Sequence, residues 1–115
     1  MDQPDELTAA IAALAAVFVS RIPATLTNMS VDLRLTEQMP PQADGWNSLH
    51  RQLHTMAGSS GSFGYMELGD HARELELKVN TLIKSMESAT DEQRSDLRAQ
   101  LQQFIDWVNA TVINA

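Results

Sequence analysis

Three histidines are the residues of this chain best suited to chemistry, and two of them lie one helical turn apart. His50 and His54 form an H-x-x-x-H pair, a spacing that places two imidazoles on one face of a helix and can bind a metal ion. No glutamate lies between them in the position that a metalloprotease uses. Asp70 and His71 would add ligands only if the fold brought them near. A metal-binding bundle is therefore one open hypothesis.

His54 is followed along the same helical face by residues that have almost no side chain. Ala57, Gly58 and Gly61 come three, four and seven positions later, on the outward stripe that begins at His54. A protein surface could reach the imidazole across this bare stripe. The alternative is that the glycines fray a helix end or let two helices pack closely.

Glu76 is the carboxylate best placed to face His54. His54 directly follows Leu53, and Glu76 directly follows Leu75. Both leucines belong to an expected core seam, the apolar stripe that a helix buries against its neighbours. If their helices pair antiparallel, the carboxylate can accept the Nδ1–H of the imidazole. That contact sets the tautomer and leaves Nε2 as an outward lone pair, which makes the histidine nucleophilic. Considered alone, Glu76 would be a solvated surface glutamate.

Serines close to His54 raise the possibility of a hydrolase. Ser60 lies on the expected core seam, however, and the chain has no G-x-S-x-G elbow of the kind that exposes a serine nucleophile. We therefore do not expect serine catalysis.

The elements that must position these residues are helices, because apolar residues recur every three or four positions and strict alternation is nowhere sustained. Pro23 is expected to mark a break, a kink or the first turn of a new helix, and the stretch "MPPQADG" is typical of a loop. Short connections predict an all-α, antiparallel up-down four-helix bundle with an additional N-terminal helix. It forms a single domain over residues 1–115. The expected helices cover about 5–20, 23–38, 44–63, 65–86 and 90–112, with the central hairpin at about 46–86.

Composition excludes several classes of function. The chain has no cysteine, which rules out disulfides and thiolate nucleophiles. A net charge of −7 and a pI of about 4.7 disfavour nucleic acid and anionic membranes as partners. The apolar stretch "LTAAIAALAAVFV" is shorter than the roughly 18–20 residues that span a bilayer. Acidic residues precede this stretch, so we expect a helix and not a secretory signal.

The segment "HTMAGSSGSFGYMELGDHARELE", residues 54–76, resembles the signature of histidine-containing phosphotransfer (HPt) domains of two-component phosphorelays. In that signature the phospho-accepting histidine is followed by glycine at the fourth position and by small residues at the fifth and sixth. Further on it has glycine, leucine, a small residue and a final leucine–glutamate pair. The matching residues here are Gly58, Ser59, Ser60, Gly64, Leu68, Ala72, Leu75 and Glu76.

The resemblance implies a phosphorelay intermediate. His54 would accept a phosphoryl group from the aspartyl phosphate of one receiver domain and pass it to another. Glu76 would orient the imidazole, and Gly58 would give the receiver clearance. The family commonly has lysine three residues after the histidine, where this chain has Ala57. Arg51, one turn before the histidine, is expected to substitute for that positive charge.

The same resemblance implies the partners, which are response-regulator receiver domains and a hybrid histidine kinase. No cofactor is expected on this chain, because Mg²⁺ would belong to the receiver. No P-loop or kinase glycine-rich loop is present, so we expect no ATP binding and no autokinase activity. We expect a cytoplasmic monomer with no nucleic-acid or membrane partner. The alternative is a non-phosphorylated helical adaptor in which His54 is incidental.

Overall fold

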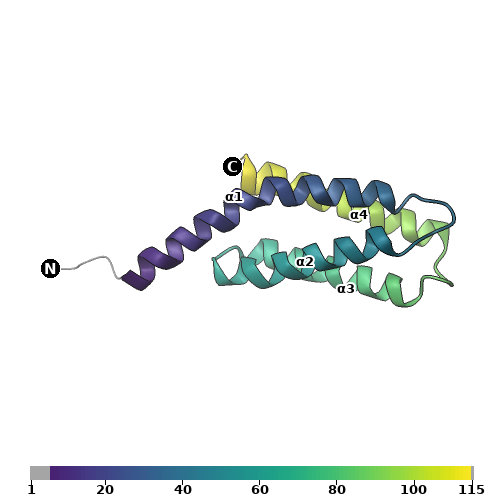
Figure 1. Cartoon of the computed structure of the whole chain (residues 1–115), viewed down its shortest axis with the longest axis horizontal. Coiled ribbons are helices and arrows are strands. Elements are labelled where there is room, and N and C mark those ends of the chain that lie inside the picture. Colours follow the sequence, from purple (N-terminus) through teal and green to yellow (C-terminus); the bar gives the residue numbers. More distant parts are fainter. Residues whose placement is uncertain (1–5, 115) are drawn as a thin grey trace.

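The computed structural model describes residues 6–114, and every regular element in that range is helical. Figure 1 shows the α-helices packed side by side, with the first part of α1 projecting beyond the others. The expected all-α class is confirmed. The elements are α1 (Glu6–Leu35), α2 (Asp44–Ser62), α3 (Met66–Lys84), α4 (Asp91–Val108) and a short π-helical segment, η1 (Asn109–Ile113), that continues α4.

α1 is a single helix, so the prediction of an additional, separate N-terminal helix is wrong. Pro23 lies inside α1. Proline lacks the N–H that would bond to the carbonyl one turn earlier. A helix that continues through a proline is therefore bent at that point. Ile22 and Leu26 on either side of it are buried in the core, which favours continuing the helix through the bend. Figure 1 shows the first part of α1 sloping away from the rest of that helix.

α1 is also long and apolar enough to cross a membrane, judged by length and composition alone, and only 6% of its most apolar 18-residue window is buried. We did not predict this from the sequence, because we counted only the stretch "LTAAIAALAAVFV". The continuous helix extends that stretch into the residues around Pro23.

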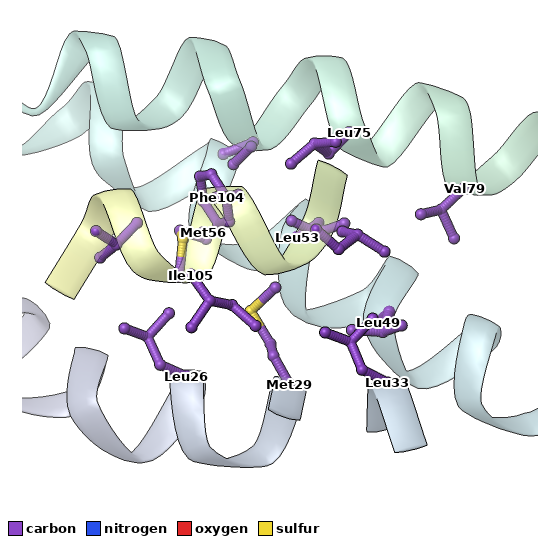
Figure 2. Packing of buried hydrophobic residues seen from close by; sticks show 14 of the residues in the cluster. Leu26, Met29, Leu33, Leu49, Leu53, Met56, Leu75, Val79, Phe104 and Ile105 are labelled. Carbon is purple, nitrogen blue, oxygen red and sulfur yellow. The ribbon is translucent and has the colours of Figure 1, made fainter. Parts of the chain in front are cut away.

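The hydrophobic core lies between the second half of α1 and the other three α-helices, and Figure 2 shows part of it. The apolar seams expected at three- and four-residue spacing provide its side chains, because each helix buries one stripe. The buried apolar residues are Ile22, Leu26, Met29 and Leu33 from α1, Trp46, Leu49, Leu53, Met56 and Ala57 from α2, Leu68, Ala72, Leu75, Val79 and Leu82 from α3, and Leu97, Leu101, Phe104, Ile105 and Val108 from α4.

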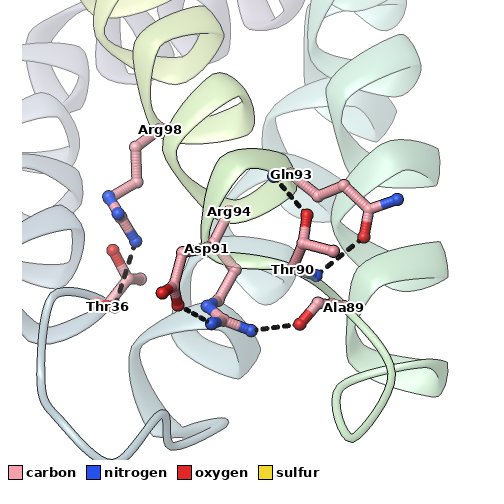
Figure 3. Close-up of polar contacts among 7 residues, drawn as sticks. All are labelled: Thr36, Ala89, Thr90, Asp91, Gln93, Arg94 and Arg98. Atoms are coloured by element: carbon pink, nitrogen blue, oxygen red, sulfur yellow. Dashed lines mark hydrogen bonds and ion pairs between the residues drawn. The ribbon is translucent and has the colours of Figure 1, made fainter.

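Figure 3 shows polar contacts at the end of the bundle where α1 ends and α4 begins. Thr90 and Gln93 form a capping box at the start of α4, which satisfies two backbone donors of the first turn. Arg98 donates to the backbone carbonyl of Thr36 at 3.2 Å. This bond joins α4 to the end of α1.

α2 and α3 form the most extensive helix pair of the bundle. They are joined by a tight turn in which Gly64 has a φ of +86°, a left-handed conformation that glycine adopts easily and that commonly ends helices. The two helices run antiparallel away from this turn. Residues equally distant from it therefore face each other, which brings Ser60 beside Gly69 and His54 beside Glu76.

Candidate functional site

The imidazole of His54 and the carboxylate of Glu76 meet across the α2–α3 pair. His54 Nδ1 lies 2.7 Å from Glu76 Oε2. The His54 side chain is 73% exposed, while that of Glu76 is 12% exposed. An ionised carboxylate can only accept a hydrogen bond, so this contact places the proton on Nδ1 and leaves the Nε2 lone pair free. The antiparallel register thus produces the contact that we expected from the two seams.

Glu76 also faces a second imidazole, which we did not predict. His50 Nε2 lies 3.6 Å from the same Oε2 atom. The rings of His50 and His54 are nearly parallel, at 14°, with their centroids 6.3 Å apart. The four-residue spacing already placed both histidines on one face of α2. Both histidines lie close to Glu76 because of the register of α3 against α2. That register cannot be predicted from the spacing of residues within α2.

Gly58 and Gly61 form an open surface on α2 beyond His54. Apart from the surrounding backbone of α2 itself, a Cβ atom added at either position would meet no described atom within 4 Å. Both lie inside α2, which continues to Ser62. Close helix packing therefore requires neither glycine, and a frayed helix end does not fit Gly58, which lies a full turn before the end of α2. The space above them is available to a molecule from outside the chain.

Ala57 does not belong to this open surface, and its expected outward position is a wrong prediction. It is buried because α3 comes very close to α2 at this level. A Cβ added at Gly69 would lie 3.4 Å from the carbonyl oxygen of Ala57 and 3.2 Å from Ser60 Cβ. The absence of a side chain at Gly69 allows this approach. A lysine at position 57 would have to run its aliphatic stem along α3.

Arg51 is exposed on α2 one turn before His54. It lines a groove between α1 and α2, where Leu14, Phe18 and Thr55 also lie. Within residues 6–114 its guanidinium forms no ion pair. This positive charge, one turn from the histidine, therefore has no carboxylate partner among the described residues.

The residues considered for other chemistry lie elsewhere or are buried. His71 packs edge-on against Trp107, with ring centroids 4.7 Å apart, so it does not join His50 and His54. Across the described part of the chain, no group of three or more His, Asp or Glu side chains is arranged to hold a metal ion. Ser60 is buried and donates to the carbonyl of Met56 at 2.6 Å, which makes it a core residue.

Comparison with known proteins adds a family to this geometry. A family model described as "Hpt domain" matches residues 13–108. Comparison with curated proteins and with solved structures gave no significant match. Hpt domains are phosphotransfer modules of two-component signalling that have no kinase activity and that interact with receiver domains and kinases. Because the match covers most of the chain, including α2 and α3 in full, the chain belongs to the Hpt domain family.

Proposed function

We propose that His54 is the phosphoacceptor of a phosphorelay. It takes a phosphoryl group from the aspartyl phosphate of a receiver domain and passes it to a second receiver. The observation that carries this proposal is the pairing of a 73% exposed imidazole with a sheltered carboxylate, at 2.7 Å from Nδ1. Membership of the Hpt domain family supports it.

The transfer is a displacement at phosphorus. The Nε2 lone pair of His54 attacks the phosphorus atom in line with the bond to the aspartyl oxygen. The N–P bond forms as that P–O bond breaks, and the bonding electrons leave with the receiver's carboxylate. The imidazole becomes positively charged and keeps its Nδ1 proton. Glu76 balances that charge through the contact at Nδ1, so no proton has to leave the site. The reverse attack by another receiver's carboxylate restores the neutral ring.

The surroundings of His54 suit a reaction in which the partner supplies most of the machinery. Phosphoryl transfer depends mainly on positioning and on neutralising charge. We propose that the open surface at Gly58 and Gly61 admits the receiver's loops. Arg51 adds a positive charge nearby. The receiver holds the Mg²⁺ ion, so this chain needs no cofactor of its own. The phosphoryl exchange takes place in the cytoplasm.

Phosphoryl transfer from labelled receivers tests the proposal. The purified chain is mixed with a panel of phosphorylated receiver domains, and the label on it is followed. We expect an acid-labile, alkali-stable phosphate that is absent from His54→Gln. His50→Gln is the matched control, because it makes the same change one turn away and should remain a phosphoacceptor. Incubation with Mg²⁺ and ATP alone should give no label.

Two results would contradict the proposal. One is unchanged labelling of His54→Gln, which would place the phosphate elsewhere. The other is failure of the wild-type chain to accept phosphate from any receiver of the panel. If receivers nevertheless bind the unlabelled chain, and bind His54→Ala equally well, the protein is a non-phosphorylated adaptor.

A further inference from the structure

The first part of α1, residues 6–21, forms an exposed apolar helix that we call the arm. Ile11, Leu14 and Val17 are 45%, 57% and 44% exposed. The chain has no charged residue between Glu6 and Arg21. Monomeric soluble proteins rarely expose a continuous apolar surface of this kind, and such surfaces usually mark an interaction site.

The exposed residues of the arm form a stripe that leads into a groove. Their three-residue spacing places them within about 120° of the helix circumference. The groove has a volume of about 400 Å³ and lies between α1 and α2. Its arm side is lined by Leu14, Val17, Phe18 and Arg21, and its α2 side includes Thr55, Met56 and Ser59. A stripe of this kind next to a groove is the arrangement by which an apolar helix is bound.

The charges at the two ends of the arm indicate what binds there. Glu6 and Arg21 are both exposed, and neither forms an ion pair with another described residue. Their separation along the helix is about 22 Å at 1.5 Å per residue. If two arms pair antiparallel about a two-fold axis near Leu14, each Glu6 lies opposite the other copy's Arg21. Parallel pairing would bring like charges together.

We propose that the arm binds a second copy of this chain, in a two-fold symmetric dimer. Each arm packs along the other and contributes its stripe to the other copy's groove, and two Glu6–Arg21 pairs close the ends. Such an interface is self-complementary, as a closed dimer requires. This dimer differs from the monomer that we expected from the sequence. The family match begins at residue 13, within the arm.

A membrane is the other environment that would accept an apolar helix, and the arm suits it less well. The uncharged residues 7–20 span about 21 Å, against about 30 Å for a bilayer core. A longer span would have to include the charge of Glu6, or that of Arg21 and then Ile22, whose side chain is buried in the bundle. The arm can lie against a second copy without disturbing that core.

Sedimentation of the whole chain over a range of concentrations tests the dimer. We expect wild type to be dimeric at micromolar concentrations. Leu14→Glu should raise the dimer dissociation constant at least about a hundredfold, because it buries a charge without a partner. Leu77→Glu is the matched control, since Leu77 is an exposed leucine on α3, and it should remain dimeric. Circular dichroism establishes that both variants are helical.

Charge reversal tests the antiparallel arrangement separately. Glu6→Lys and Arg21→Glu should each weaken the dimer by about two- to fivefold, and the double variant should regain the wild-type affinity. A double variant weaker than both single variants would overturn the arrangement. A wild-type chain that stays monomeric at all concentrations would overturn the dimer itself. Binding to phosphatidylcholine vesicles by such a monomer would show that the arm meets a membrane instead. None of these measurements depends on phosphorylation, so their outcome is independent of the role proposed for His54.

Discussion

A Cβ atom added at Gly58 of α2 would meet nothing within 4 Å, whereas one added at Gly69 of α3 would lie 3.2 Å from Ser60 Cβ. The two glycines are on paired helices, yet they lack a side chain for different reasons. At Gly69 the missing side chain lets the chain pack against itself. At Gly58 no internal neighbour requires glycine, and glycine in a helix costs about 1 kcal/mol relative to alanine. This difference supports the proposal that the open surface beside His54 admits a receiver domain.

The largest expected effect comes from filling the open surface. Gly58→Leu should lower the rate of phosphoryl transfer from a receiver by about a hundredfold, because bulk beside His54 prevents close approach of the reacting atoms. The transfer rate is measured by stopping the reaction with one labelled receiver at a series of times and following the label on the chain. Gly61→Leu, which lies almost one turn further from His54, is the matched control and should have a smaller effect. Equal rates for Gly58→Leu and wild type would mean that the receiver does not pass over this surface.

A side chain added at the closely packed Gly69 should lower the stability of the fold and leave phosphoryl transfer intact. Gly69→Val should lower the free energy of unfolding by about 1–3 kcal/mol, because its side chain would push α3 away from Ser60 and Ala57. Urea titration followed by circular dichroism measures this loss. The folded variant should still accept phosphate. If Gly69→Val lost phosphoryl transfer and kept its stability, Gly69 would serve the partner and not the packing of α3 against α2.

Restoring the lysine that the family commonly carries tests the correction at position 57. Ala57→Lys should lower the free energy of unfolding by about 1 kcal/mol, since the stem of the lysine must fit beside α3, while its ammonium group reaches solvent. The urea midpoint is the measurement. Thr55→Lys adds the same charge at an exposed position of α2 and should leave the midpoint unchanged. Equal midpoints for the two variants would show that α3 does not confine position 57.

The smallest effect is a gain in stability at the open glycines. Gly58→Ala and Gly61→Ala should each raise the free energy of unfolding by about 0.4–1 kcal/mol, because alanine restricts the unfolded chain and its methyl group meets no neighbour. Thermal unfolding of the two variants measures it. Destabilisation by either substitution would mean that these positions are packed after all.

Much of the site followed from local patterns in the sequence. Periodic apolar residues predicted the seams of α2 and α3, and the positions of His54 and Glu76 next to those seams predicted their contact. The capping box of α4 likewise joins residues only three positions apart, Thr90 and Gln93. Such features depend on contacts within one helix or on the register that a short turn imposes on two helices. Both can be predicted from the amino-acid sequence.

Other features depend on distances between helices. Ala57 and Gly58 are neighbours in the sequence and differ by one helical step, yet the approach of α3 at Gly69 buries the first and leaves the second open. His50 shares Glu76 with His54 for the same reason, since the position of α3 decides which imidazoles its carboxylate reaches.

The amino-acid sequence by itself determined the helices, their buried seams and the bare stripe that follows His54, because these arise from side-chain type and helical periodicity. Only the tertiary structure decided which side of that stripe is covered and whether α1 ends at Pro23. A proline in a helix costs free energy, but burial of Ile22 and Leu26 on either side of it favours continuing the helix. The resulting arm is exposed because the other helices of the bundle end before they could cover it (Figure 1).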